Sequence, residues 1–205
     1  MGHVRLSVPT CLIIYLKKSV KSLKELFRIG RGPSSSHTMG PQKAAEIFLA
    51  RNPEAARFEV TLYGSLAATG HGHLTDVAIT DILQPVAPLE IVWRPDVFLP
   101  FHPNGMRFKA FAADDAIIDD WTVYSIGGGA LSEGENDTLN TETRDIYPLN
   151  TLAEIQQWCE AHGKGYWEYV AECEDSDIWD YLMEAWITMK EAVERGLDHE
   201  GALPG

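Results

Sequence analysis

The sequence predicts an α+β fold: a small, mostly antiparallel sheet packed with helices. Phe58, Val60 and Leu62 alternate with polar neighbours, which is typical of a half-buried strand. Asn104-Gly105 between apolar stretches favours a hairpin. The C-terminal third has apolar residues at helical spacing, namely Ile178, Leu182, Ala185, Met189 and Val193.

Further elements are expected in order along the chain. Residues 22–27 predict a short helix, and Pro41, suited to a first helical turn, predicts a helix through about Arg51. We expect a strand at 58–63, a helix at 74–83, hairpin strands at 97–102 and 106–111, and a strand at 117–126 that ends at Gly127-Gly128-Gly129.

The helical third carries its own boundary signals. Thr151 with Glu154 three residues later forms a capping box, and Gly196 is expected to end the last helix. The aromatic residues of that helix are interpreted as core or interface packing rather than ligand contacts; they are Trp179, Tyr181 and Trp186.

Composition and charge limit the classes of partner. The 205 residues carry a net charge of −13, which argues against nucleic acid or an anionic membrane as the main partner. Three cysteines form no C-x-x-C pair and cannot alone hold a four-cysteine cluster, so reduced thiols in the cytoplasm are expected. We read residues 1–20 as an N-terminal extension and residues 21–205 as one domain. The apolar run at 10–16 within the extension is too short to cross a bilayer.

Two stretches carry candidate chemistry. Ser34, Ser35, Ser36, His37 and Thr38 precede a helix, so their hydroxyls and backbone N–H groups form either an anion site or simple helix caps; the residue types leave both open. Between a strand and a helix, a loop with three glycines carries His71 and His73. A metal pair lacks partner ligands at familiar spacing, and a general base is the more attractive role for a histidine here.

Taken together, these stretches resemble the iron–sulfur L-serine dehydratases, and specifically their N-terminal β domain. The matching segments occur in the family's order over about Ser22 to the end; they are 29–41, 63–76, 104–106, 124–129 and 196–205. The resemblance implies a fold similar to the allosteric substrate-binding domain of some phosphoglycerate dehydrogenases. It also implies that an α domain, which supplies a [4Fe–4S] cluster, follows in the family after Leu203-Pro204-Gly205. The chain is therefore expected to be a truncated, split or deliberately cut version.

The implied activity is a lyase reaction, the elimination that converts L-serine to pyruvate and ammonia, in a site shared between the two domains. His73 matches the family's base, whereas His71 stands where the family usually has lysine. Residues 34–38 would form the wall that faces the substrate carboxylate and the cluster; Tyr63, Ser65 and Asn104 are further candidates for substrate contact.

The resemblance also sets what this chain is expected to do alone. We expect no metal site in the chain itself, no dehydratase activity without the α partner, and self-association through the apolar surface that the partner would cover. The alternatives are a non-catalytic module that binds serine or another small anion, and an inactive fragment.

Overall fold

The computed structural model describes residues 20–135, 139 and 145–202. They divide into two compact units. The larger comprises the described residues within Leu23–Arg144 and Asp175–Gly205; the smaller comprises those within Met1–Ser22 and Asp145–Glu174. Most of the predicted extension and the Leu203-Pro204-Gly205 end lie outside the described residues, so the boundary at residue 20 stays a prediction.

The larger unit is built on a five-stranded sheet in the order β3-β2-β4-β5-β6. Its strands are β2 (Arg57–Tyr63), β3 (Leu89–Arg94), β4 (Gly105–Phe111), β5 (Ile117–Gly127) and β6 (Ala130–Ser132). Three of the four pairings are antiparallel, and β2 with β3 is the parallel one. The mostly antiparallel α+β fold expected from the sequence is confirmed.

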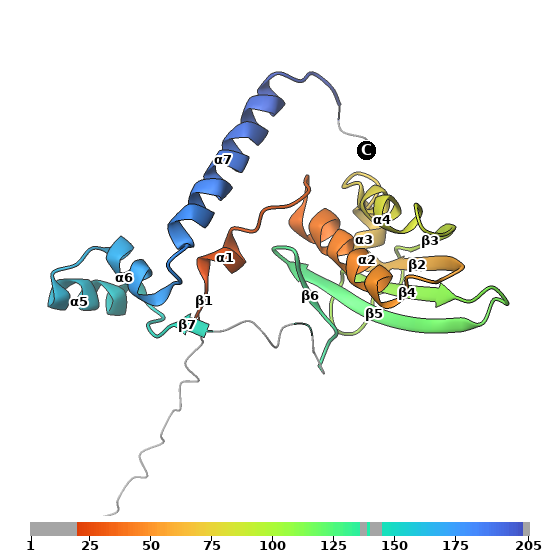
Figure 1. Cartoon of the computed structure of the whole chain (residues 1–205), viewed down its shortest axis with the longest axis horizontal. Helices are drawn as coiled ribbons and strands as arrows, with labels where there is room; N and C mark the ends of the chain where they lie inside the picture. Colours follow the sequence, from red (N-terminus) through yellow and green to blue (C-terminus); the bar gives the residue numbers. More distant parts are fainter. Residues whose placement is uncertain (1–19, 136–138, 140–144, 203–205) are drawn as a thin grey trace, which may run out of the picture. The chain divides into compact units, whose positions relative to one another are not determined.

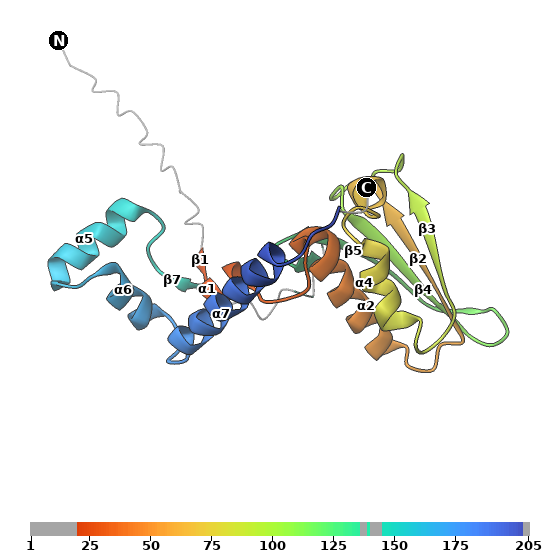
Figure 2. The same ribbon diagram turned by 90° about the horizontal axis from the view of Figure 1, so that it is seen from above.

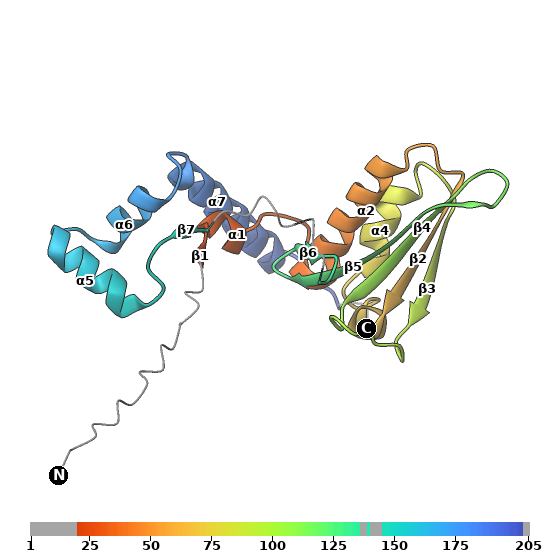
Figure 3. The same ribbon diagram turned by 90° about the horizontal axis from the view of Figure 1, so that it is seen from below.

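Helices α2 (Gly40–Arg51) and α4 (Thr75–Leu83) cover one face of this sheet (Figure 1, Figure 2). Alternation along β2 turns Phe58, Val60 and Leu62 towards them, and all three are fully buried. The other face, seen with its strands in Figure 3, carries the ion pairs Lys109–Glu59 at 2.7 Å and Arg107–Asp120 at 2.5 Å.

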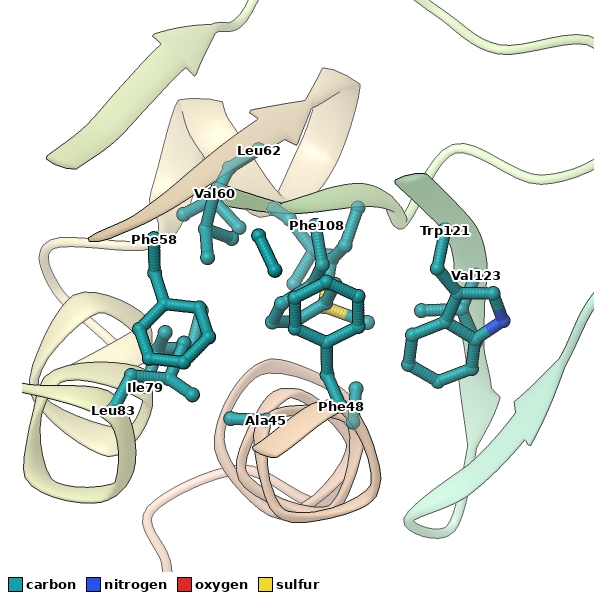
Figure 4. Packing of buried hydrophobic residues seen from close by; sticks show 14 of the residues in the cluster. Ala45, Phe48, Phe58, Val60, Leu62, Ile79, Leu83, Phe108, Trp121 and Val123 are labelled. Carbon is teal, nitrogen blue, oxygen red and sulfur yellow. The ribbon is translucent and has the colours of Figure 1, made fainter. Parts of the chain in front are cut away.

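Aromatic side chains fill the space between α2 and the sheet (Figure 4). Phe48 of α2 lies 5.4 Å from Phe108 and 6.2 Å from Trp121, measured between ring centroids, and its ring is nearly parallel to the indole. Phe48 and Phe108 are fully buried. This packing holds α2 against β4 and β5.

Two connections correct the predictions. The prediction of a hairpin between residues 97–102 and 106–111 is wrong. Strand β4 pairs with β2 and β5, and residues 97–102 form no strand. Instead β4 and β5 form the hairpin, closed by a hydrogen bond from Ala112 N–H to the Ala116 carbonyl at 2.9 Å. Strand β3 was not predicted.

The two segments with candidate chemistry are more helical than expected. Residues Ser35–Met39 form the π-helical turn η1 rather than a loop, and it continues directly into α2. The first part of the predicted glycine loop is the short helix α3 (Gly64–Thr69). Helix α1 (Leu23–Leu26) and helix α4 lie where the sequence predicted them.

Helix α7 (Ile178–Leu197) completes the larger unit and packs against α1. The Tyr181 hydroxyl donates to the Phe27 carbonyl at 2.6 Å, and Ile178 and Ala185 are buried. Gly196 lies inside the helix, which ends one residue later, so its predicted role as the stop is wrong by one position. Trp179 and Trp186 are 43% and 59% exposed, which contradicts the core alternative for these two residues; the interface alternative stays a prediction.

The smaller unit is mainly helical. Strands β1 (Val20–Lys21) and β7 (Asp145–Tyr147) pair in antiparallel fashion, followed by α5 (Leu152–His162) and α6 (Tyr166–Cys173). The predicted capping box of Thr151 and Glu154 is confirmed. Glu174 accepts hydrogen bonds from Ser22 and Tyr147, which joins both ends of the unit. Among the described helices, none combines the length and hydropathy needed to cross a membrane.

Candidate functional site

The turn before α2 positions the first group of candidate residues. Ser34, in extended conformation, accepts a hydrogen bond from the His37 N–H at 3.3 Å and so caps η1. Ser36 Oγ lies 2.9 Å from His37 Nδ1 and 3.5 Å from Ser34 Oγ. Ser35 is exposed, and its carbonyl accepts from the Gly40 N–H. The turn thus gathers hydroxyl groups around one imidazole.

His73 lies against His37 although 36 positions separate them in the chain. Their ring centroids are 4.7 Å apart and the rings are tilted by 36°. Ser65, in α3, places its Oγ 3.4 Å from His37 Nε2. The structure therefore brings together Ser34, Ser36, His37, Ser65 and His73.

One hydrogen bond determines the tautomer of neutral His73. Its Nδ1 lies 2.9 Å from the Thr69 carbonyl oxygen, which can only accept, so Nδ1 carries the proton. Nε2 of the neutral ring is then left with a lone pair. A histidine held in this way can accept a proton at Nε2, which is the requirement for a general base.

Two buried threonines fix the backbone at both histidines. Thr38 Oγ1 donates to the His73 carbonyl at 2.9 Å, and Thr75 Oγ1 donates to the His37 carbonyl at 2.5 Å. Both threonines are fully buried. The two bonds are reciprocal, because each histidine segment supplies the donor for the other's carbonyl.

The electrostatics of the pair favour a neutral His37. Partial burial lowers the pKa of its imidazole below the ordinary 6.5, and the neighbouring His73 lowers it further; a hydrogen bond to the Ser65 backbone opposes both effects. A neutral His37 can accept as well as donate hydrogen bonds among the surrounding hydroxyls.

Two of the predicted site residues, Tyr63 and Asn104, interact with residues outside the histidine pair. Tyr63 interacts with Arg107, on the sheet face opposite Leu62. Asn104 is buried, and its amide donates to the Ser125 carbonyl at 3.2 Å while its own carbonyl accepts from the Ser125 N–H. Asn104 thus joins the start of β4 to β5.

A cavity of about 550 Å³ lies apart from the histidine pair. It is bounded by the 28–31 segment, α2, Gly129 and α7, and neither His37 nor His73 lines it. Its lining mixes cations and anions, with Arg28, Arg31 and Lys43 beside Glu46 and Glu184.

Comparison with known proteins assigns the family. The family model described as "Serine dehydratase beta chain" matches residues 22–91 and 81–136, which include β2, β4, β5 and both histidines. The chain belongs to the serine dehydratase beta chain family.

Named relatives agree with this assignment. The chain is similar to "L-serine dehydratase 2" of Escherichia coli K12, with 33% identity over 90% of this chain and 50% of that protein. It is 32% identical to "L-serine dehydratase" of Streptomyces coelicolor over 90% of this chain and 51% of that protein. The "L-serine dehydratase" of Helicobacter pylori J99 is 32% identical over 73% of this chain and 42% of its own length. The chain therefore spans about half the length of these relatives.

Within this beta-chain site, His71 has different neighbours from His73. Its ring stacks on Trp93 of β3 with centroids 3.9 Å apart, and its Nδ1 lies 3.4 Å from Asp76 Oδ2. Its side chain is 70% exposed. His71 thus contacts the edge strand and the first turn of α4 rather than His37.

Sequence reasoning missed the supporting residues of the site. The Thr69 carbonyl sets the His73 tautomer, and Thr75 holds His37. Thr75 lies two residues after His73 in the segment that resembles the family, which was a usable signal; a backbone carbonyl leaves none. Ser125 was also missed as the partner of Asn104.

Proposed function

We propose that this chain is the β part of an L-serine ammonia-lyase, in which it supplies the proton-accepting base and contacts to the substrate carboxylate. The observation that carries the proposal is His73, whose Nδ1–H is held by a carbonyl so that Nε2 can accept a proton. Membership of the beta-chain family and relatives named L-serine dehydratase support the reaction class.

In the proposed reaction, His73 Nε2 takes the proton from Cα of L-serine. The electron pair of that C–H bond forms the Cα–Cβ double bond as hydroxide leaves Cβ. The resulting aminoacrylate tautomerises and is hydrolysed to pyruvate and ammonia. Thr38 and Thr75 hold the backbone at His73 and His37, so the base keeps its position as the proton moves.

The hydroxyl-rich turn is proposed to bind the carboxylate. Ser34, Ser36 and Ser65 lie around His37, and hydroxyl groups can donate to a carboxylate without bringing a fixed charge. The exposed Ser35 lies in the same turn and completes the proposed wall, whereas Thr38 is fully buried and supports the wall through its bond to the His73 carbonyl.

The described residues do not suit the [4Fe–4S] cluster that the resemblance implies. They contain no group of three or more His, Cys, Asp or Glu side chains that could hold a metal. Of the cysteines among them, Cys159 is buried, and burial raises the pKa of the Cys173 thiol, which disfavours the thiolate that binds iron. We therefore assign the cluster to an α partner, together with the help that the departing hydroxide needs.

The setting of the enzyme is part of the same proposal. The described cysteines, Cys159 and Cys173, are free thiols, which supports a reducing, cytoplasmic compartment. The net charge of −13 supports partners other than nucleic acid and membranes.

Reconstitution tests the proposal. The chain is mixed with the separately expressed half of Escherichia coli L-serine dehydratase 2 that it does not match, loaded anaerobically with its cluster, and pyruvate formation from L-serine is measured. We expect activity in the mixture and none from the chain alone. His73→Ala should lower the rate by about 10²–10⁴-fold, the usual contribution of a general base.

His71→Ala is the matched control, because it removes an imidazole two residues away that contacts Trp93 and Asp76 instead of His37. It should retain activity within about tenfold, since a change outside the acid–base step leaves the proton transfer intact. Full activity of His73→Ala would contradict the assigned base. A docked complex with an intact cluster and no activity would favour a binding module or an inactive fragment, and calorimetric titration with L-serine would separate those two.

A further inference from the structure

Helix α7 (blue in Figure 1) exposes an unusual number of large apolar side chains. Seven of them are between 43% and 81% exposed: Trp179, Met183, Trp186, Ile187, Met189, Val193 and Leu197. Scattered exposed apolar residues are normal, but a contiguous row on one helix indicates a surface that binds something.

The helix already uses another face inside the larger unit. Ile178 and Ala185 are buried there, and Tyr181 bonds to the Phe27 carbonyl. The exposed row begins one residue, about 100°, further round the helix. It therefore remains uncovered among the described residues after α1 has packed.

Five residues of the exposed row, together with Lys190, have the spacing of a coiled coil. Positions 179, 183, 186, 190, 193 and 197 follow one another at intervals of four, three, four, three and four residues, which is the a/d pattern of a heptad. We call these six positions the outer stripe. Five are apolar and the sixth is Lys190, at an a position. A heptad stripe packs best against another helix with the same repeat.

We propose that the outer stripe is an interface with a second copy of this chain, in which two α7 helices pack antiparallel about a two-fold axis. In that arrangement a positions face d positions. Trp179 meets Leu197 of the second copy, Met183 meets Val193, and Trp186 meets Lys190. Each layer occurs twice by symmetry, as an isologous interface requires.

Charge selects the antiparallel orientation. A parallel pair would place Lys190 against Lys190 of the second copy in the centre of the interface, where like charges are costly. The antiparallel pair instead places each Lys190 ammonium against a Trp186 ring, a favourable cation–π arrangement.

The flanking positions support the same register. Ile187 faces Ile187 of the second copy on one side of the stripe and Met189 faces Met189 on the other, which widens the apolar contact. The one unfavourable contact sets Asp180 opposite Glu194 of the second copy. It lies at the solvent-exposed edge, where such repulsion is weak, and Lys190 lies 3.8 Å from Glu194 in its own helix.

Sedimentation equilibrium of the full chain over a range of concentrations tests the interface. We expect a reversible dimer. Trp186→Lys places a second ammonium against Lys190 in two symmetric layers and should weaken the dimer by about 100-fold or more, since each layer loses a cation–π contact and gains like-charge repulsion, together worth tenfold or more. Lys190→Leu completes the apolar stripe and should strengthen it.

Trp167→Lys is the matched control, because Trp167 is 64% exposed, close to the 59% of Trp186, but lies on α6 in the other unit. It should leave the dimer unchanged. A chain that stays monomeric at all concentrations, or a dimer that Trp186→Lys leaves intact, would overturn the proposal. If Trp186 became protected from solvent only after the other half of a relative was added, the outer stripe would be the interface with that half. That result would also overturn the proposed dimer.

A photo-cross-link tests the orientation. Met183 is replaced by p-benzoylphenylalanine, the dimer is irradiated, and tryptic peptides are identified by mass spectrometry. Trypsin cuts after Lys190 and Arg195, so the antiparallel dimer should link position 183 to the peptide 191–195. Attachment to the peptide that contains position 183 of the second copy would show a parallel pair and contradict the proposed register.

Discussion

At the scale of single residues, the roles of the two histidines differ because their ring nitrogens meet different atoms. His73 Nδ1 faces the Thr69 carbonyl oxygen, whereas the His37 ring meets the hydroxyls of Ser36 and Ser65 and the backbone of Ser65. A hydroxyl can donate or accept, so the serines can bond to His37 whether its facing nitrogen carries a proton or not, while neutral His73 keeps one tautomer. This asymmetry favours His73 as the base and His37 as a group that adapts to a bound anion.

The pKa of His37 should lie below 6.5 in the folded chain, because burial and His73 both disfavour its charged form. Titration of its Cε1–H signal by NMR measures this. His73→Ala removes one of the two causes and should raise the pKa of His37 towards 6.5. A value at or above 6.5 in the unaltered chain would contradict the described environment.

The same shift has a consequence for stability. Below pH 6.5 the unfolded chain protonates His37 before the folded chain does, so the free energy of unfolding should fall as the pH drops, until the folded pKa is passed. His37→Gln cannot bind this proton and should flatten the dependence within that window. Urea titrations of both proteins at several pH values provide the measurement.

The sequence indicated several of the residues that belong to the candidate site but not how they come together. The Ser34–Thr38 run and His73 could be singled out because their residue types and glycine-rich surroundings are informative. That they lie together could not, because contact between rings 36 positions apart depends on how α2 and α4 pack. Tyr63 was placed near them in sequence, but strand alternation turns it to the opposite face.

At the scale of elements, the sequence predicted those helices and strands that are determined by neighbouring residues along the chain. Strand β2 and helix α7 were predicted from their periodic apolar faces, and helix α2 was predicted from Pro41 in its first turn. The predicted helix at 74–83 and strand at 117–126 also lie where α4 and β5 are found. The hairpin at Asn104-Gly105 failed because that turn signal is local, whereas β4 pairs with β2 and β5 from elsewhere in the chain. Asn104 bonds to Ser125 instead of closing a two-residue turn.

Gly40 shows how one element depends on another. Its backbone is ordinary helix, with φ −59°, so no conformational reason requires glycine. A Cβ there would fall well inside 3.0 Å of Ser125 Oγ, a fully buried atom of β5. Gly40→Ala should therefore lower the free energy of unfolding by about 1–3 kcal/mol, as overpacking does.

The double variant Gly40→Ala/Ser125→Gly removes the obstructing hydroxymethyl group and should recover part of that loss. Gly196→Ala is the comparison within a helix, because nothing lies within 4 Å of a Cβ at Gly196. It should be neutral or stabilising by up to about 1 kcal/mol. Equal effects of Gly40→Ala and Gly196→Ala in urea unfolding would show that the contact with Ser125 does not matter.

At the scale of the molecule, the chain folds as two units that local sequence reasoning did not separate. The smaller unit joins residues before Leu23 to residues 145–174 through the pairing of Val20 with Tyr147. A two-residue strand such as β1 has too few residues to show a period. The larger unit has the continuous core, and its stability rests on the aromatic cluster around Phe48.

Phe48→Ala should lower the stability of the larger unit by about 3–5 kcal/mol, because a fully buried ring is lost and a cavity remains. Native-state hydrogen exchange at the amides of β2 and β4 reports this unit alone. Phe98→Ala is the control, since that ring is 66% exposed, and it should cost less than about 1 kcal/mol. Similar losses for both variants would contradict a core centred on Phe48.

The reciprocal threonine bonds have a consequence for how the site changes over evolutionary time. Thr38 and Thr75 each hold the carbonyl beside the other segment's histidine, so a substitution at either one loosens both. Neither segment is then free to drift independently, even though each is a separate stretch of sequence. Double-mutant cycles should show coupling between the two positions, and homologues should keep both hydroxyls or lose both together.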